Sequence, residues 1–309
     1  MDYNELGSTG LRVAPVALGT GSIGEMFGPA SVEDAVRVVH WAIDHGINLI
    51  DTSTYYGSAE ERLGIALAGR RDSVILATKA GRFGFDDFDF SPSRIRRSLE
   101  HSLSVMKTDF VDVFHLHDVE CVPLDDVLTE GFATLQELKD EGKCRFVGMT
   151  GYPLRMIERV MRETDVDVVL NYAGATLLDS SLTETVVPLA AERGVGVISA
   201  AAVALGLLTP GGSNIQIDHP ATPVIAESAD RMRALAAERG VDISFAANQF
   251  AVQRSGAATT VVGTSKIRHL ESAIRAAEEP IDAELAEAFL ALRPPLGERR
   301  WISGLPENN

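Results

Sequence analysis

Short apolar runs alternate along the chain with longer segments in which apolar residues recur every three or four positions. Short runs rich in Val, Ile and Leu and bounded by Gly, Pro, Asn or Asp predict buried strands. The longer segments predict amphipathic helices. The predicted strands are 13–18, 48–51, 74–79, 110–116, 145–149, 166–170, 196–199 and 259–262. The predicted helices are 32–45, 60–67, 93–105, 124–141, 153–163, 182–193, 225–239, 244–253, 267–277 and 283–290.

This repetition predicts a parallel sheet in which each strand is followed by a helix. Eight such units in succession favour a closed (β/α)8 barrel, the TIM barrel, over an open doubly wound sheet. A turn signal at Gly7–Gly10 predicts an N-terminal β-hairpin, which can plug one end of the barrel. The pattern has no linker, so we expect one domain over residues 1–309, with extra C-terminal helices and a long loop from Ser199 to Pro220.

The stretch Gly19–Gly24 reads G-x-G-x-x-G after a predicted strand, which is the pattern of an open dinucleotide-binding sheet. In that alternative, Asp51 would bind the ribose. The motif also requires a helix to begin within it. Here Gly28 and Pro29 follow, and the helix is predicted to begin only after Ser31. We therefore keep the open sheet as a minor alternative.

Composition and charge exclude several classes of partner. The net charge of −16 disfavours nucleic acid and anionic membranes, because both attract basic surfaces. The N-terminus has no signal-peptide pattern and no apolar run is long enough to span a bilayer. The two cysteines have no metal or redox spacing, which is typical of a reducing compartment. We expect a cytoplasmic protein, monomeric or homo-oligomeric, that acts on a small molecule.

Ionisable residues follow the second, third and fourth predicted strands. Asp51 and Lys79 end their strands, His117 follows its strand, and Tyr56 lies five residues after Asp51. The carboxyl ends of parallel strands meet at one face, so these side chains should converge there. A phenol has a pKa of about 10, and a nearby lysine favours its ionised form. Alternatively, Asp51 caps the next helix and Tyr56 is a half-buried aromatic residue.

The run His115-Leu116-His117 places two imidazoles on one face of a strand, which is also a metal-site pattern. A barrel metallohydrolase would need further ligands on later strands. Those strands end instead on Thr150, Asn171 and residues of similar chemistry. We therefore expect no metal site and a structural role for His115.

The chain resembles the aldo-keto reductase family. The resemblance rests on Asp51-Thr52-Ser53-x-x-Tyr56-Gly57, Ala77-Thr78-Lys79, Leu116-His117, Gly142-Lys143-x-Arg145-Phe146-Val147-Gly148 and Gly263-Thr264-Ser265-Lys266. It implies that Asp51, Tyr56, Lys79 and His117 form a catalytic tetrad. In it, Tyr56 is the acid or base, Asp51 and Lys79 tune it, and His117 orients the substrate. The chain is most similar to the branch of L-galactose dehydrogenases and L-fucose (D-threo-aldose) 1-dehydrogenases.

The resemblance also implies a nicotinamide dinucleotide. The residues expected to contact it are Gly19, Thr20, Gly21, Asp51, Thr150, Asn171, Ser199, Leu207, Gly263, Thr264, Ser265, Lys266 and His269. The chain departs from the family where Thr150-Gly151, Val169 and Ala200 replace residues that usually hold the nicotinamide. Gly263 and His269 replace basic residues, which favours NAD over NADP, although Lys266 and Arg268 lie close by.

By the same resemblance, the reaction is oxidation of an aldose such as L-galactose, L-fucose or D-arabinose at C1 to its lactone. Candidate substrate contacts are Ile23, Tyr55, Phe83, His117, Tyr152 and Trp301. A second hypothesis is a broad NADPH-dependent aldehyde or ketone reductase. A remote third is a non-catalytic, cofactor-sensing subunit.

Overall fold

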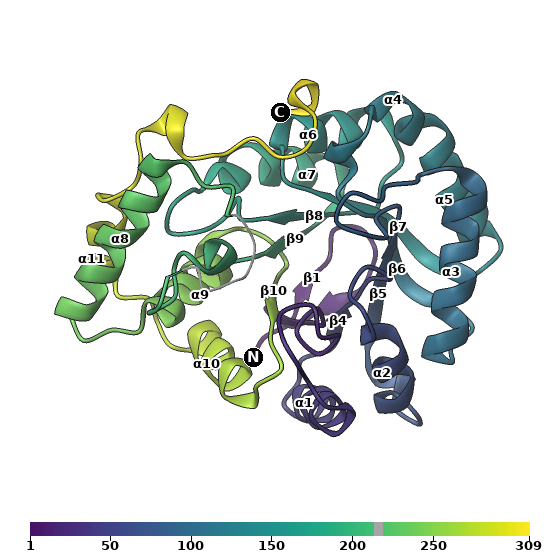
Figure 1. Cartoon of the computed structure of the whole chain (residues 1–309), viewed down its shortest axis with the longest axis horizontal. Coiled ribbons are helices and arrows are strands. Elements are labelled where there is room, and N and C mark those ends of the chain that lie inside the picture. The colour runs from purple at the N-terminus through teal and green to yellow at the C-terminus, as the bar shows by residue number, and fades with distance from the viewer. Residues whose placement is uncertain (213–218) are drawn as a thin grey trace.

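A closed barrel of eight parallel strands forms the centre of the computed structural model, which describes residues 1–212 and 219–309 (Figure 1). The strands pair in chain order and β10 closes the ring between β9 and β3. The prediction of a (β/α)8 barrel is confirmed, and the open-sheet alternative is wrong. The strands are β3 (Val16–Gly19), β4 (Leu49–Asp51), β5 (Ile75–Ala80), β6 (Val111–Leu116), β7 (Cys144–Gly151), β8 (Val168–Tyr172), β9 (Gly196–Ala200) and β10 (Thr259–Gly263).

Helices surround the barrel, and α8 and α11 lie together at one end of the long axis (Figure 1). Within the described ranges, no helix is long and apolar enough to cross a membrane. The helices are α1 (Val32–Asp44), α2 (Ala59–Ala66), α3 (Pro92–Met106), α4 (Leu124–Asp126), α5 (Phe132–Asp140), α6 (Leu154–Glu163), α7 (Val187–Arg193), α8 (Pro223–Glu238), α9 (Ile243–Arg254), α10 (Ile267–Glu278) and α11 (Ala283–Leu290).

Most predicted elements match these bounds within a few residues, with three differences. The first barrel strand begins at Val16 rather than Val13, because Val13 pairs with Asn4 in the hairpin. The predicted helices 124–141 and 182–193 are each interrupted by a π-helical segment, Val127–Gly131 and Leu182–Val186 respectively. Of the predicted loop up to Pro220, residues 213–218 lie outside the described residues.

The N-terminal hairpin closes the amino end of the barrel, as predicted. Its strands are β1 (Asn4–Glu5) and β2 (Arg12–Val13), and Leu6 and Leu11 between them join the apolar cluster inside the barrel. Gly7 has a φ of +57°, and a Cβ there would lie 2.3 Å from the backbone nitrogen of Gly196 in β9. Only glycine tolerates this approach. The hairpin therefore seals the end opposite the predicted site.

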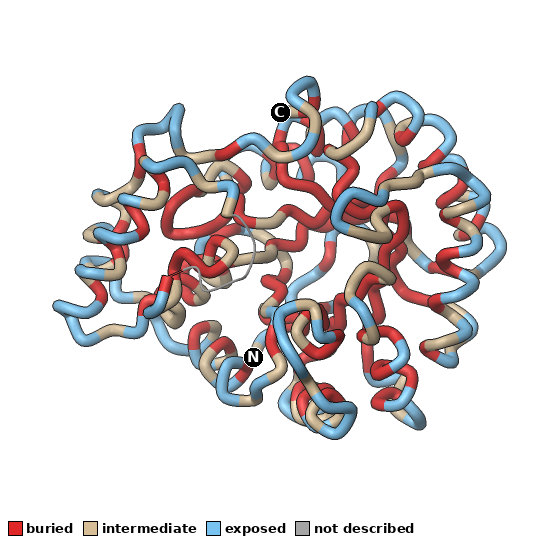
Figure 2. Tube along the Cα trace, viewed as in Figure 1, coloured by how far each residue is buried: buried red, intermediate tan, exposed pale blue. Residues whose placement is uncertain are grey.

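Side chains alternate along each strand between the barrel interior and the surrounding helices. The strands at the centre of the molecule are coloured as buried over most of their length (Figure 2). Leu49 faces inward and Ile50 outward, and Ala77 and Leu76 follow the same alternation. Two residues beyond an inward position, the next side chain faces inward again. This rule directs Asp51 and Lys79 into the barrel at its carboxyl end.

The C-terminal tail is fixed to the loop after β6 through the buried residue Glu120. Glu120 is fully buried, and its Oε1 accepts hydrogen bonds from the Tyr152 backbone N–H at 3.1 Å and the Tyr172 hydroxyl at 2.9 Å. Its backbone carbonyl accepts from Leu305 at 2.8 Å and from the Asn308 amide at 2.9 Å. Burial raises the pKa of Glu120 to about 8. The tail therefore ends beside α6, next to the loop that follows His117 (Figure 1).

Candidate active site

A buried ion pair joins β4 and β5 at the carboxyl end of the barrel. Lys79 Nζ lies 2.6 Å from Asp51 Oδ2 and 2.8 Å from the Thr52 carbonyl oxygen. The two residues are 1% and 3% exposed, so water hardly competes for these bonds. Burial raises the pKa of Asp51, and the lysine opposes this rise. The alternative in which Asp51 caps α2 is wrong, because Ser58 occupies the cap position.

Tyr56 lies over this pair in the turn that follows β4. Lys79 Nζ is 4.9 Å from the centre of its ring, and the His117 ring meets it edge-on at 5.7 Å. The structure therefore brings the four predicted catalytic side chains together. Burial raises the pKa of Tyr56 well above its ordinary value, and the Asp51 and Asp118 carboxylates raise it further. From the sequence, Lys79 was expected to favour the ionised form of Tyr56. The pKa of Tyr56 shifts in the opposite direction, because the lysine charge is paired with Asp51. Tyr56 is accordingly protonated at neutral pH.

Ser53, which the sequence analysis did not single out, is the hydrogen-bond partner of His117 Nδ1. Its hydroxyl oxygen lies 3.0 Å from His117 Nδ1 and accepts the Tyr55 N–H at 3.1 Å. Burial lowers the pKa of His117 to about 3, so the ring is neutral at pH 7. With the proton on Nε2, Ser53 donates to Nδ1 and the Nε2–H faces Asp118 Oδ2 at 3.7 Å. The other tautomer would turn a lone pair toward that carboxylate. The arrangement thus favours an Nε2–H, which can donate to a substrate oxygen.

His115 is fully buried two residues before His117, and neither of its ring nitrogens has a hydrogen-bond partner among the residues that the structure describes. Burial and the positive charge of Lys79 lower its pKa well below the ordinary value, so it is neutral. An added Cβ at Gly148 would lie 2.3 Å from His115 Nδ1, so the ring fills the space beside that glycine. In the part of the chain that the structure describes, no cluster of three or more His, Cys, Asp or Glu side chains could hold a metal ion.

The ends of β3 and β10 leave space beside Asp51. Gly19 and Gly263 pair in register, and a Cβ at Gly263 would meet nothing within 4 Å. At Gly19 it would lie 2.8 Å from the Val261 side chain, so only glycine fits there. Thr20 hydrogen-bonds to the Asp51 carbonyl at 3.0 Å and holds the following turn, which includes Gly21, against β4. These positions suit a flat group that lies across the mouth of the barrel, which is the opening at the carboxyl ends of the strands.

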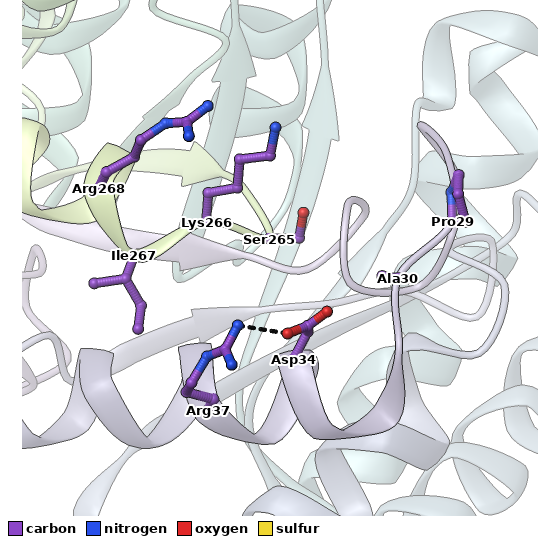
Figure 3. A pocket seen from close by; sticks show the side chains of 8 residues that line it. All are labelled: Pro29, Ala30, Asp34, Arg37, Ser265, Lys266, Ile267 and Arg268. Atoms are coloured by element: carbon purple, nitrogen blue, oxygen red, sulfur yellow. Dashed lines mark hydrogen bonds and ion pairs between the residues drawn. The ribbon is translucent and has the colours of Figure 1, made fainter.

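A pocket of about 480 Å³ lies between the loop before α1 and the start of α10 (Figure 3). Ser265, Lys266 and Arg268 line one side of it. Arg37 and Asp34 line the other and are paired with each other at 2.5 Å (Figure 3). Two cations and the loop hydroxyl are the chemistry that holds phosphate groups of a dinucleotide.

Next to this pocket, the Thr264 hydroxyl lies 2.9 Å from His269 Nδ1, which fixes the loop that leads into α10. Burial, Arg268 and Lys266 lower the pKa of His269, so at neutral pH it adds no cation.

The other predicted cofactor contacts are buried at strand ends. The Thr150 hydroxyl bonds Asp118 at 3.0 Å, and the Asn171 amide donates to the carbonyls of Gly151 at 2.8 Å and Tyr152 at 3.0 Å. Leu207 is buried, and its carbonyl accepts a bond from a helix α8 arginine. The buried polar atoms that have no partner among the described residues include Asp51 Oδ1, Thr52 Oγ1, Asn171 Oδ1 and Ser199 Oγ. Such atoms fit a polar ligand, because unpaired buried groups are unfavourable. Val169 points outward to the helices, so its departure from the family does not alter the mouth.

The predicted substrate contacts other than His117 divide into four groups. Tyr55 lies beside the tetrad, with its ring 6.0 Å from that of His117. Tyr152 and Trp301 stack at 4.6 Å and are almost fully buried, so they form a wall that anchors the tail. Phe83 is half-buried beneath Arg94 on α3. Ile23 is wrong as a lining residue, because its side chain is completely buried in the core between barrel and helices.

Comparison with known proteins places this geometry in a family. The sequence model of the aldo/keto reductase family matches residues 15–293. The chain is 37% identical to L-galactose dehydrogenase of Arabidopsis thaliana, with 100% of this chain and 99% of that protein covered. It is 30% identical to D-arabinose 1-dehydrogenase of Saccharomyces cerevisiae (85% and 82% covered) and 29% identical to D-threo-aldose 1-dehydrogenase of a Pseudomonas species (93% and 97%). A solved aldo-keto reductase from Bacillus halodurans, in its holo form, superposes with a TM-score of 0.78 at 26% identity, covering 97% of this chain and all of the other.

Replacement of Tyr56 tests whether its hydroxyl carries the proton. Tyr56→Phe should lower turnover about 100- to 10,000-fold, the usual range for a lost acid or base. Binding of the dinucleotide, followed by fluorescence titration, should change little. Tyr3→Phe is the matched control, because its hydroxyl bonds the Gly46 carbonyl at the far end of the barrel. Near-normal turnover by Tyr56→Phe would contradict the assignment of Tyr56 as the acid or base.

Replacement of Ser53 tests the tautomer of His117. Ser53→Ala should lower kcat about tenfold, which corresponds to one lost hydrogen bond. Nitrogen-15 NMR of the ring should then show both neutral tautomers, whereas the wild-type protein shows Nε2–H alone. Ser53→Thr keeps a hydroxyl and should restore both readouts. A single Nε2–H signal in Ser53→Ala would rule out this role for the serine.

Proposed function

The chain belongs to the aldo/keto reductase family and is therefore an NAD(P)-dependent oxidoreductase; from this premise we propose that it oxidises an aldose at C1 to the lactone. Sugars of the L-galactose, L-fucose and D-arabinose type are the proposed substrates. The observation that carries the proposal is the cluster formed at the carboxyl end of the barrel by buried Asp51, Lys79 and His117 with half-buried Tyr56. Relatives named as dehydrogenases of L-galactose, D-arabinose and D-threo-aldoses support the substrate class.

In the proposed reaction, the cyclic sugar loses a hydride from C1 and a proton from the C1 hydroxyl. A nicotinamide dinucleotide held by Lys266, Arg268 and the strand ends at Gly19 and Gly263 would supply the hydride acceptor. The His117 Nε2–H donates a hydrogen bond to the sugar oxygen and holds it at the Tyr56 hydroxyl. Tyr56 takes the proton in its ionised form, and Lys79 stabilises the phenolate across 4.9 Å from Nζ to the ring centre. Asp51 fixes the position of the lysine.

We propose NAD as the preferred cofactor, with NADP as the alternative. A 2′-phosphate needs cations that no neighbouring carboxylate neutralises. In the pocket at α10, Asp34 pairs with Arg37, and His269 is neutral. Lys266 and Arg268 remain, and both phosphates of the dinucleotide bridge compete for them. This balance favours the cofactor with fewer negative charges.

A second candidate is the reverse chemistry, reduction of simple aldehydes or ketones. The raised pKa of Tyr56 favours it, because a protonated phenol can donate to a carbonyl oxygen. The relatives' names and the polar residues beside His117 favour sugar oxidation. We further propose that residues 1–309 act as one domain, since the tail packs on Glu120 beside the site.

The substrate proposal is tested by following the absorbance of reduced nicotinamide. L-galactose, L-fucose and D-arabinose share one configuration at C2 and C3, and each is supplied with NAD or NADP. We expect turnover of these sugars, with kcat/KM at least about tenfold higher for NAD, since one hydrogen bond to a charged group is worth about 1.5 kcal/mol or more. The matched blank is Tyr56→Phe with the same sugars. Silence with every sugar, together with NADPH oxidation by simple aldehydes, would favour the second candidate instead.

A further inference from the structure

A second ion pair lies at the barrel mouth, directly beside His117. Arg82 follows β5, and Asp118 follows His117 in the chain. Arg82 Nη1 donates to Asp118 Oδ2 at 2.6 Å, and the same carboxylate oxygen lies 3.7 Å from His117 Nε2. The side chains keep 20% and 11% of their surface exposed, whereas Lys79 keeps 1%. The pair is therefore open to a ligand, unlike the pair beneath Tyr56.

Loops from three strands hold this pair in place. Asp118 has a φ of +53°, a left-handed backbone that turns its carboxylate back toward His117. The Thr150 hydroxyl donates to Asp118 Oδ1 and accepts the Asp118 N–H, each at 3.0 Å. The Arg82 guanidinium lies 4.3 Å above the Tyr55 ring and donates to its hydroxyl at 3.3 Å. Such bracing fixes the pair before any ligand binds, which reduces the entropy lost on binding.

The pair keeps free hydrogen-bonding capacity. Burial acts to raise the pKa of Asp118, but the charge of Arg82 and the hydrogen bonds from Arg82 and Thr150 outweigh it, so the carboxylate is ionised. An ionised carboxylate has about four acceptor positions. Arg82 occupies one of those on Oδ2 and Thr150 one on Oδ1. The guanidinium has five N–H groups, and three of them bond Asp118, Tyr55 and the Gly84 carbonyl. An acceptor and a donor thus remain side by side.

We propose that Arg82 and Asp118 recognise the hydroxyl on the carbon next to the reacting one, so that the enzyme selects 2-hydroxy aldehydes, in open or cyclic form. This inference rests on the proposed function. If the reacting oxygen bonds His117 Nε2, a neighbouring hydroxyl lies about one hydrogen-bond length from it, roughly 2.8 Å. Asp118 Oδ2, at 3.7 Å from Nε2, is then within reach of that hydroxyl. The hydroxyl donates to the carboxylate and accepts from Arg82.

A substrate without this hydroxyl leaves the charged pair incompletely bonded. A hydrogen bond to a charged group corresponds to roughly a 10- to 100-fold change in affinity. The wild-type enzyme should therefore prefer an aldose over its 2-deoxy analogue by that factor in kcat/KM. Asp118→Asn keeps the shape and removes the charge. Because it also changes the surroundings of His117 and Tyr56, both sugars should slow, but the aldose should slow more, so the ratio should fall close to one. Arg82→Lys, which retains a cation but loses the fork, should lower the ratio in the same direction.

The experiment measures kcat/KM for L-galactose and 2-deoxy-L-galactose with NAD in the wild-type enzyme and both variants. Asp44→Asn is the control, because Asp44 forms an ion pair of the same residue types with Arg70 on the surface, 2.6 Å apart. A wild-type ratio near one would overturn the inference. An equal loss for both sugars in Asp118→Asn would also overturn it, since the residue would then act only through His117.

A second pair of substrates separates this inference from the proposed function. If no aldose is oxidised, the proposed function fails, and reduction of glycolaldehyde and acetaldehyde is compared instead. These aldehydes differ by the same 2-hydroxyl group. A wild-type preference for glycolaldehyde that Asp118→Asn removes would uphold recognition of the hydroxyl, and equal rates would overturn it. The wild-type ratio decides the matter even if a variant fails to fold.

Discussion

The buried ion pair between Lys79 and Asp51 is the constraint on which the site depends. Two opposite charges lie 2.6 Å apart at the carboxyl ends of adjacent strands, and both are almost completely buried. Removing one partner of such a pair generally destabilises a protein by about 3–5 kcal/mol, because the remaining charge is left buried. A closed barrel supplies what this pair needs, since β4 and β5 are held in register and covered on both faces. The pair therefore forms a rigid charged surface against which Tyr56 lies.

Burial around this ion pair determines the protonation of the neighbouring groups. Tyr56 is kept protonated and His117 neutral, so both present a hydrogen to a substrate oxygen. Ser53 and Asp118 bracket the imidazole and favour one tautomer. Beside them, Gly263 at the end of β10 leaves room for a cofactor. The site thus combines a buried charged pair, Asp51 and Lys79, with a more exposed pair, Arg82 and Asp118. We assign the reaction at Tyr56 to the surroundings of the first pair and substrate selection to the second.

Much of this arrangement could be predicted from the sequence because it follows from local rules. The positions of Asp51, Lys79 and His117 follow from apolar strands that end on a polar residue, and the hairpin follows from its turn residues. Contacts between loops could not be predicted in the same way. Ser53 and His117 are 64 residues apart, and Arg82 and Asp118 are 36 apart, so only the folded barrel brings each pair together. For the same reason, the sequence did not predict the direction in which the Ile23 side chain points. The raised pKa of Tyr56 was missed because sequence shows the neighbouring lysine but not the burial that outweighs it.

The pH dependence of aldose oxidation tests most directly whether Tyr56 is the proton acceptor. A protonated phenol must ionise before it can take a proton, and below its pKa the ionised fraction rises tenfold for each pH unit. At saturating NAD, kcat/KM for the sugar should therefore increase steadily between about pH 6 and pH 9, approaching tenfold per unit. The increase should be absent from the residual activity of Tyr56→Phe. A wild-type kcat/KM that does not change with pH over this range would contradict the account, because the acceptor would then already be ionised or would be another group.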